Sequence, residues 1–323
     1  MQLGTIAAWM NLDPMTPSQA SATAQRVEQL GFSALWFSDS MTYDSLTRAS
    51  TLLSATSSLI VATGITSIYN RPAWSTGAAQ RVLFDQSDGR FLLGLGVSHK
   101  SSVEDAKRRT YGPPVATMRA YLSELDTEIA ARDRVLESHG ADERPSLRRA
   151  RMPRVISALG PKMLELARDQ CDGAHPYLVT PAHTHAAREA LGVQRWLCVE
   201  QKVIRQKDPS TARAVARRHL AIYLALPNYL GSWRRLGFDD EDFAGGGSDR
   251  LIDAMVAWGD DDAILRRIAD HLDAGASQVC IQALPGSDES ASLGPAWSTL
   301  ELVADAYRET SPSQVVATTA EGA

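Results

Sequence analysis

The sequence opens on LGTIAAW at residues 3–9, continues through TPSQ at residues 16–19 and reaches ALWF at residues 34–37. The first and last stretches are short apolar runs, which are typical of buried strands. The middle stretch offers a capping threonine, a proline at the first helical position and a glutamine three residues after the cap. A strand, a helix and a second strand in this order predict a parallel sheet with helices on its outside.

The same alternation recurs along the rest of the chain. It predicts strands at residues 3–9, 34–37, 59–65, 90–97, 154–158, 174–177, 196–203 and 278–283. It predicts helices from Thr16 and at about residues 73–84, 114–138, 260–274 and 295–307, with two more opening at Thr180-Pro181 and Asp208-Pro209. Eight such strands predict an α/β protein, a (β/α)₈ TIM barrel.

Three segments depart from the alternation. Residues 226–258 contain three consecutive glycines and predict an inserted helical segment before the last strand. Residues 141–151 are rich in arginine and predict a solvated loop. Residues 311–323 predict a disordered tail, which leaves one barrel domain over residues 1–310.

Composition excludes several classes of protein. The 323 residues are 44% hydrophobic and carry a formal net charge of -5, with both signs interspersed. No basic face is therefore expected for nucleic acid or acidic lipid. The start shows no signal-peptide pattern, and no stretch is apolar enough to span a bilayer. We expect a cytoplasmic protein with a small-molecule substrate and neither membrane nor nucleic acid as partner.

The cysteines and histidines show no metal-binding spacing. Cys171, Cys198 and Cys280 are far apart and form no C-x-x-C pair, so we interpret them as small buried hydrophobes. His183 and His185 are neighbours but lack the H-E-x-x-H pattern. We expect no metal site.

Titratable residues follow two of the predicted strands, at the end where barrel active sites lie. Asp39 follows the second strand and either positions a substrate or caps the next helix. His99 follows the fourth strand and titrates near neutrality, which suits proton transfer, although a surface histidine is the alternative. Gly94 and Gly96 precede it and permit close backbone approach to a ligand.

Two helix starts and one loop suit a cofactor. Gly160-Pro161-Lys162-Met163 follows the fifth strand and combines free backbone N–H groups with a cation, so it can hold a phosphate. Val179-Thr180 lies at a second helix start and could share that anion, with ordinary turns as the alternative. Residues 64–72 suit contacts to a ring, although Arg71 could equally lie at the surface. The aromatic residues Trp233, Phe238 and Phe243 favour packing within the insertion over shielding a cofactor.

The motifs at residues 35–39, 89–96 and 159–163 together resemble the luciferase-like monooxygenase superfamily. Residues 226–229 and 247–251 look like an actinobacterial branch of coenzyme F420-dependent oxidoreductases. The resemblance covers nearly the whole chain. It implies a barrel that binds F420, or alternatively FMN, in an open mouth where hydride passes between the ring and a substrate. It also points to a homodimer formed through barrel helices.

The resemblance places functions on individual residues. Asp39 matches an acidic residue after the second strand, and His99 falls where relatives carry a glutamate acid. Gly64-Ile65 matches a non-proline cis peptide behind the ring, and the phosphate region matches Gly160, Lys162, Met163, Val179 and Thr180. The expected catalytic residues are His99 and Asp39, and the expected cofactor contacts are Asp39, Gly64, Ile65, Thr66, Gly96, Val97, Ser98, Gly160, Pro161, Lys162, Met163, Val179 and Thr180. An FMN-dependent monooxygenase and a non-catalytic flavin-binding protein are the alternatives.

Overall fold

Parallel strands close into a barrel in the computed structural model, which describes residues 1–39, 42–138, 151–286 and 295–308. The barrel strands are β1 (Ile6–Met10), β2 (Ala34–Phe37), β3 (Ile60–Thr63), β5 (Phe91–Gly96), β6 (Arg154–Ile156), β7 (Gly173–Ala174), β8 (Trp196–Ile204) and β10 (Gln278–Leu284). Neighbours in this order pair in parallel, and β10 pairs with both β8 and β1. This closure confirms the predicted (β/α)₈ barrel.

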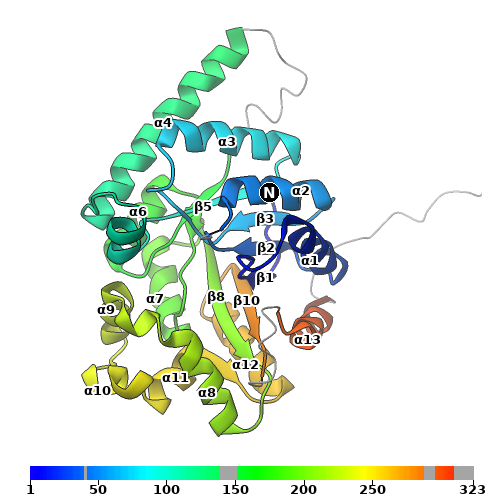
Figure 1. The fold of residues 1–323 in the computed structure, drawn as a ribbon, viewed down its shortest axis with the longest axis vertical. Coiled ribbons are helices and arrows are strands. Elements are labelled where there is room, and N and C mark those ends of the chain that lie inside the picture. Colours follow the sequence, from blue (N-terminus) through cyan, green and yellow to red (C-terminus); the bar gives the residue numbers. More distant parts are fainter. Residues whose placement is uncertain (40–41, 139–150, 287–294, 309–323) are drawn as a thin grey trace, which may run out of the picture.

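Helices surround the barrel, as Figure 1 shows. They are α1 (Pro17–Gln29), α2 (Ser45–Ala55), α3 (Ala73–Gln86), α4 (Pro114–Ser138), α6 (Pro161–Gln170), α7 (Pro181–Leu191), α8 (Pro209–Leu220), α12 (Asp261–Asp273) and α13 (Trp297–Arg308). Thr16 and Gln19 form the expected capping box of α1. Thr180 and Asp208 likewise cap α7 and α8 with their side chains, so these helices begin where the sequence predicts. None of the described helices is long and apolar enough to cross a membrane.

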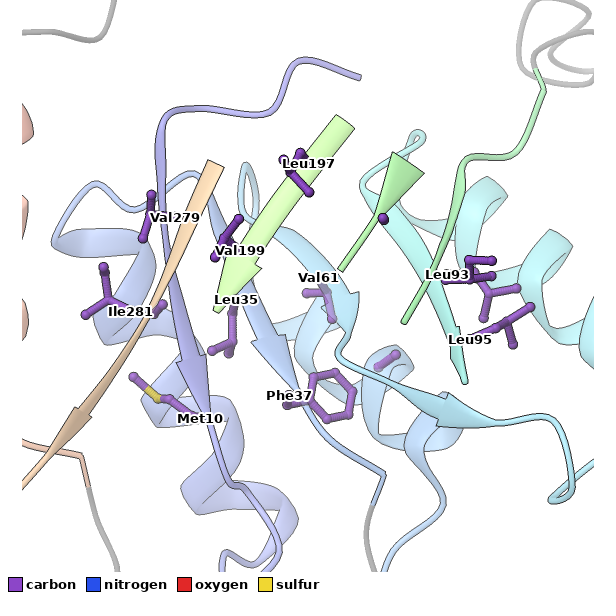
Figure 2. Close-up of a cluster of buried hydrophobic side chains, with 14 of the residues drawn as sticks. Met10, Leu35, Phe37, Val61, Leu93, Leu95, Leu197, Val199, Val279 and Ile281 are labelled. Carbon is purple, nitrogen blue, oxygen red and sulfur yellow. The ribbon is translucent and has the colours of Figure 1, made fainter. Parts of the chain in front are cut away.

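The barrel strands bury both of their faces. One face points at the helices, where side chains from neighbouring strands, such as Leu35, Val61 and Leu93, form the main core (Figure 2). The other face fills the barrel with a smaller apolar cluster that includes Trp9, Trp36 and Leu92. Because side chains alternate along a strand, a polar residue on the inner face lies inside the barrel and away from water.

The segment before the last strand is helical, as expected, but ends in a short strand. It contains two 3₁₀ turns, η2 (Tyr223–Ala225) and η3 (Ala244–Gly246), the helices α9 (Pro227–Arg235), α10 (Asp240–Phe243) and α11 (Asp249–Met255), and then β9 (Val256–Trp258), which pairs with the end of β8. Trp233 is fully buried and donates from Nε1 to the Leu178 carbonyl at 3.1 Å. It packs with Phe238 and Phe243, as the packing interpretation expects.

The third and sixth predicted strands differ from the observed ones. The third divides into β3 and the two-residue β4 (Thr66–Ser67), and the cis peptide bond Gly64-Ile65 lies between them. The sixth ends three residues early, at Ala174, so Tyr177 lies beyond the strand. A one-turn π-helix, η1 (Ser102–Ala106), follows β5. The predicted disordered tail and all of the arginine-rich loop except Arg151 lie outside the described residues.

Candidate active site

A bulge at Gly64-Ile65 lies at the carboxyl end of β3. The Gly64 N–H donates to the Phe37 carbonyl at 2.7 Å, and the Ile65 carbonyl accepts from the Asp39 N–H at 2.9 Å. A Cβ atom on Gly64 would lie 2.8 Å from Trp9 Nε1 and 2.9 Å from His175 Nε2. The bulge therefore rests directly on the indole and the imidazole inside the barrel, and a side chain at position 64 would push it off them.

His175 forms the floor under this bulge. Its ring stacks on Trp36 with the centroids 4.4 Å apart. Nδ1 donates to the Cys198 carbonyl at 2.8 Å, and Nε2 accepts from Trp9 Nε1 at 3.3 Å. Burial lowers the pKa of His175 to about 4, so the ring is neutral at neutral pH. Both ring nitrogens of His175 are therefore engaged in hydrogen bonds, and the side chain supports the bulge from below.

The buried histidines predict a loss of stability in mild acid. Burial holds the pKa of His175 at about 4 and that of His271 at about 3, against about 6.5 in an unfolded chain. The unfolded state therefore takes up more protons below that pH, and each histidine costs about 1.4 kcal/mol of unfolding free energy per pH unit. The free energy of unfolding should therefore fall as the pH is lowered from about 7 to about 5. In His271→Gln its change per pH unit should be smaller by the contribution of one proton. An equal change in this variant and in the wild type would show that the pKa of His271 is not lowered in the folded protein.

The glycines of β5 face the neighbouring strand. A Cβ on Gly94 would lie 1.8 Å from the Thr63 carbonyl oxygen, and one on Gly96 would lie 2.5 Å from Ile65 Cδ1. The sequence predicts close approach of a ligand at these glycines, whereas in the structure the space beside them is taken by the β3 backbone and by the Ile65 side chain. Gly96 is buried beneath the bulge, so it supports the candidate site from behind.

His99 lies just beyond β5, half-buried, with its ring 5.9 Å from that of Tyr229 on α9. Nδ1 is buried and has no hydrogen-bond partner among the described residues. Burial lowers the pKa of His99, and a hydrogen bond to Asn228 partly opposes this. A neutral imidazole with one unused nitrogen suits proton transfer.

Val97 and Ser98, which connect β5 to His99, are also half-buried. Ser98 has a positive φ of 58°, and its carbonyl accepts from the Tyr111 hydroxyl at 3.4 Å. This backbone turn directs His99 toward α9.

Asp39 lies beyond β2 and does not cap the next helix, because Asp44 caps α2. The Asp39 carboxylate accepts from Asn70 Nδ2 at 2.5 Å and lies 3.4 Å from Lys107 Nζ. Lys107 also donates to Asn70 Oδ1. Asp39 is thus part of a bridge between the loop after β2 and the loop that carries His99.

Lys107 is expected to hold the loop after β5 in place. Lys107→Met removes its bonds to Asp39 and Asn70, so amide hydrogen exchange across residues 98–112 should accelerate. A partly buried ion pair of this kind contributes about 1 kcal/mol. Lys100→Met is the matched control, because Lys100 pairs with Glu104 across 3.9 Å at an exposed position of the same loop. Equal exchange in both variants would contradict the bridge.

The predicted phosphate region lies at the start of α6. Gly160 is its N-cap, and no side chain caps its first turn. Lys162 is exposed at this start, and Arg235 from α9 donates to the Leu159 carbonyl at 3.0 Å. The region therefore offers backbone N–H groups and two cations, which suit an anionic group.

The other residues expected there contribute less. Met163 and Val179 are buried in the main core, and Thr180 accepts from the His183 N–H as the cap of α7. Their side chains are committed to packing or capping. Thr66 is similar: its buried hydroxyl bonds to that of Ser45. Pro161 is exposed in the first turn of α6. Arg71 is half-exposed and pairs with Asp44 at 2.9 Å.

A polar cluster inside the barrel was not predicted from the sequence. It consists of Tyr177, Glu200, Lys202, Tyr223 and Gln282, joined by hydrogen bonds. The available signal was Glu200 and Lys202, two residues apart and so on the same face of a strand in which Gln201 is the one other polar residue. The described residues contain no cluster of three or more metal-ligating side chains, and Cys171, Cys198 and Cys280 are buried free thiols.

Comparison with known proteins matches residues 1–278 to the family model described as luciferase-like monooxygenase. A Mycobacterium tuberculosis protein named as a coenzyme F420-dependent oxidoreductase is 24% identical over 88% of this chain and 95% of its own length. The F420-dependent tetrahydromethanopterin reductase of Methanopyrus kandleri superimposes with a TM-score of 0.70 at 19% identity, over 93% of this chain and 97% of its own. An FMN-bound Baeyer-Villiger monooxygenase component from Pseudomonas putida gives 0.64 at 12%, over 94% and 97%.

Proposed function

The chain belongs to the luciferase-like monooxygenase family, and on that premise we propose that it is a coenzyme F420-dependent oxidoreductase acting on a small organic substrate. When bound, the deazaflavin supplies hydride exchange at its ring. His99 serves as acid or base at the substrate, and Asp39 orients the loops around it. The names of the Mycobacterium and Methanopyrus proteins support F420 as the cofactor.

The observation that carries this proposal is His99 at the carboxyl end of β5, the strand that packs against the bulge through Gly96. It is a half-buried imidazole at a barrel strand end with Nδ1 unpartnered among the described residues. Gly96 beneath Ile65 ties the bulge to the same strand. Barrel enzymes carry out their chemistry at this end of the strands. Proton transfer there needs a titratable side chain with a nitrogen or oxygen that no other group of the protein already binds.

The residues around the bulge suit the parts of F420. Gly64-Ile65 would support the planar ring, and Val97 and Ser98 would border it. The phosphate-bearing chain would lie at Gly160, where α6 offers its first turn and Arg235 Nη2 lies 3.6 Å from the position of an added Cβ.

FMN is the alternative cofactor, because the Pseudomonas component holds it in a similar fold. The protein would then be a monooxygenase that activates oxygen. A non-catalytic flavin-binding protein is the alternative outside the enzyme class, and the unpartnered nitrogen of His99 counts against it.

Separate titrations of the purified protein with F420 and with FMN test the proposal. We expect F420 to bind tightly and FMN weakly. Arg235→Met should weaken F420 binding by about tenfold, because a charge-assisted bond contributes about 1.5 kcal/mol or more. Arg234→Met is the matched control, since this neighbouring residue pairs with Asp240 at the surface. Tight FMN binding would favour the monooxygenase, and binding of neither would overturn both enzymes.

A further inference from the structure

A lysine ammonium group is buried inside the barrel at the carboxyl end of β8. Lys202 Nζ donates to Glu200 Oε1 at 3.1 Å, to the Tyr177 hydroxyl at 2.5 Å and to Gln282 Oε1 at 2.7 Å. It also lies 4.0 Å from the centre of the Tyr177 ring. All three protons of the ammonium are thereby used. We refer to Tyr177, Glu200, Lys202, Tyr223 and Gln282 as the Lys202 cluster.

A buried ion pair is by itself weak evidence of a stabilising role, because removing two charges from water costs free energy. The side chains of Lys202 and Glu200 are 1% and 0% exposed, and an apolar pair of similar size is generally no worse in such a place. The rest of the barrel interior is mainly apolar and includes Ala7, Ala62 and Val155. A buried ion pair at the end of the strands where barrel enzymes act is therefore a candidate for function.

Exposure increases from the ion pair toward the hydroxyl groups. Glu200 and Lys202 are buried, whereas Tyr177, Tyr223 and Gln282 are each partly exposed. The Tyr177 hydroxyl accepts from Lys202 and, at 3.1 Å, from Tyr223, and it donates to Gln282 Oε1 at 3.0 Å. An ammonium that donates to a phenol oxygen strengthens the phenol as a hydrogen-bond donor. The buried charge thus acts on the hydroxyl of a tyrosine whose side chain is partly exposed.

The Lys202 cluster adjoins the bulge and His99. The Trp9 ring lies 5.2 Å from that of Tyr177, while Trp9 Nε1 donates to His175 under the bulge. On the other side, Tyr229 lies 6.4 Å from Tyr177 and 5.9 Å from His99. Trp9 and Tyr229 each contact both Tyr177 and a part of the candidate active site, so the Lys202 cluster adjoins that site.

We infer that Tyr177 donates a hydrogen bond to the oxygen of a carbonyl substrate, with Lys202 and Glu200 as positioning residues that strengthen this donor. The inference rests on the proposed function and specifies its substrate class, ketones and aldehydes or the alcohols derived from them. Gln282 holds the Tyr177 proton until a substrate oxygen replaces it.

Reduced F420, when bound, would supply the hydride for this step. The hydride and its two electrons would form the new C–H bond as the C=O π bond breaks, so the carbonyl would be reduced and the F420 oxidised. The charge that develops on the oxygen is stabilised by the Tyr177 O–H. His99 then supplies the proton that completes the alcohol. Oxidation of an alcohol is the reverse, with His99 as base.

Tyr177→Phe tests the inference because it removes the hydroxyl and keeps the ring. With reduced F420 and a panel of small ketones and aldehydes, we expect kcat to fall by about 10²-fold, the usual effect of losing one such donor. F420 affinity should stay unchanged. Tyr307→Phe is the matched control, because Tyr307 is a half-buried tyrosine of α13, which packs on the outside of the barrel. Its kcat should equal that of the wild type.

An infrared measurement tests the contact without turnover. Isotope-labelled cyclohexanone bound to the protein with oxidised F420 should show a carbonyl stretch at lower frequency than in water, because the donor polarises the bond. Tyr177→Phe should abolish this shift. The double variant Glu200→Leu/Lys202→Met should reduce it, and it removes both charges together so that neither is left buried alone.

The possible outcomes separate the inference from the proposed function. Failure of the wild type to bind F420 overturns the proposed function and the inference with it. Binding of F420 without reduction of any carbonyl in the panel overturns the substrate class alone. Unchanged kcat and an unchanged carbonyl band in Tyr177→Phe overturn the role of Tyr177, while the F420-dependent oxidoreductase stands.

Discussion

His99→Ala is expected to lower turnover on a substrate that the wild type uses by about 10²-fold or more, the usual effect of losing a general acid or base. The imidazole lies at the mouth with Nδ1 unpartnered among the described residues, and alanine offers no group to exchange a proton. F420 affinity should stay close to that of the wild type, since the proposed contacts to the cofactor lie elsewhere. Steady-state rates and a fluorescence titration measure the two effects. Unchanged turnover would remove His99 from the mechanism.

His99→Gln is the control for size and polarity. Glutamine keeps a polar side chain near Asn228 but does not titrate.

Burial lowers the pKa of His99, so the neutral ring predominates at neutral pH. Alcohol oxidation needs this neutral base, so its rate should rise with pH through the lowered pKa and then level off. Carbonyl reduction needs the protonated form and should slow over the same range. In His99→Gln, both the rise of the oxidation rate and the fall of the reduction rate with pH should disappear.

Local patterns were sufficient to predict the scaffold. Thr16 and Gln19 cap α1 because a capping box depends only on neighbouring residues. The positions of the eight strands follow from apolar runs, although several of their ends differ from the prediction, and the closed ring follows from their number. Asp39 and His99 could be placed at the mouth because every parallel strand ends on the same side. The cis peptide at Gly64-Ile65 was expected from the family resemblance alone, and the structure contains it.

Contacts between distant segments could not be predicted in this way. Lys107 follows the one-turn π-helix and pairs with Asp39, 68 residues away in the sequence, and no spacing in the sequence indicates this contact. Tyr223 and Tyr229 lie before the last strand but contact Tyr177, which depends on how that segment folds over the barrel. The sequence shows Glu200 and Lys202 within a strand but does not show that they are buried. A charged residue in a strand usually faces water, whereas both faces of these strands are buried.

The bulge depends on the absence of a side chain at Gly94. The register passes from Ala62 opposite Leu92 to Thr66 opposite Leu95, so three residues of one strand lie opposite two of the other. Thr63 fills this gap. Its hydroxyl accepts from the Gly94 N–H and donates to the Gly94 carbonyl, both at 2.8 Å. The two backbones are thus held together at the point where the candidate active site begins.

Gly94→Ala is expected to lower the free energy of unfolding by about 4 kcal/mol or more, the range of severe core disruptions. The added Cβ would lie 1.8 Å from the Thr63 carbonyl oxygen, and because this atom belongs to the backbone, β3 and β5 must separate. Gly77→Ala is the matched control: its Cβ meets only the Leu125 and Ile129 side chains, at 3.2 Å and 3.4 Å, and alanine favours the helix by up to about 1 kcal/mol. Urea unfolding of both variants measures the difference. A Gly94→Ala protein as stable as Gly77→Ala would show that the strands can yield here, and the bulge would then not depend on this glycine.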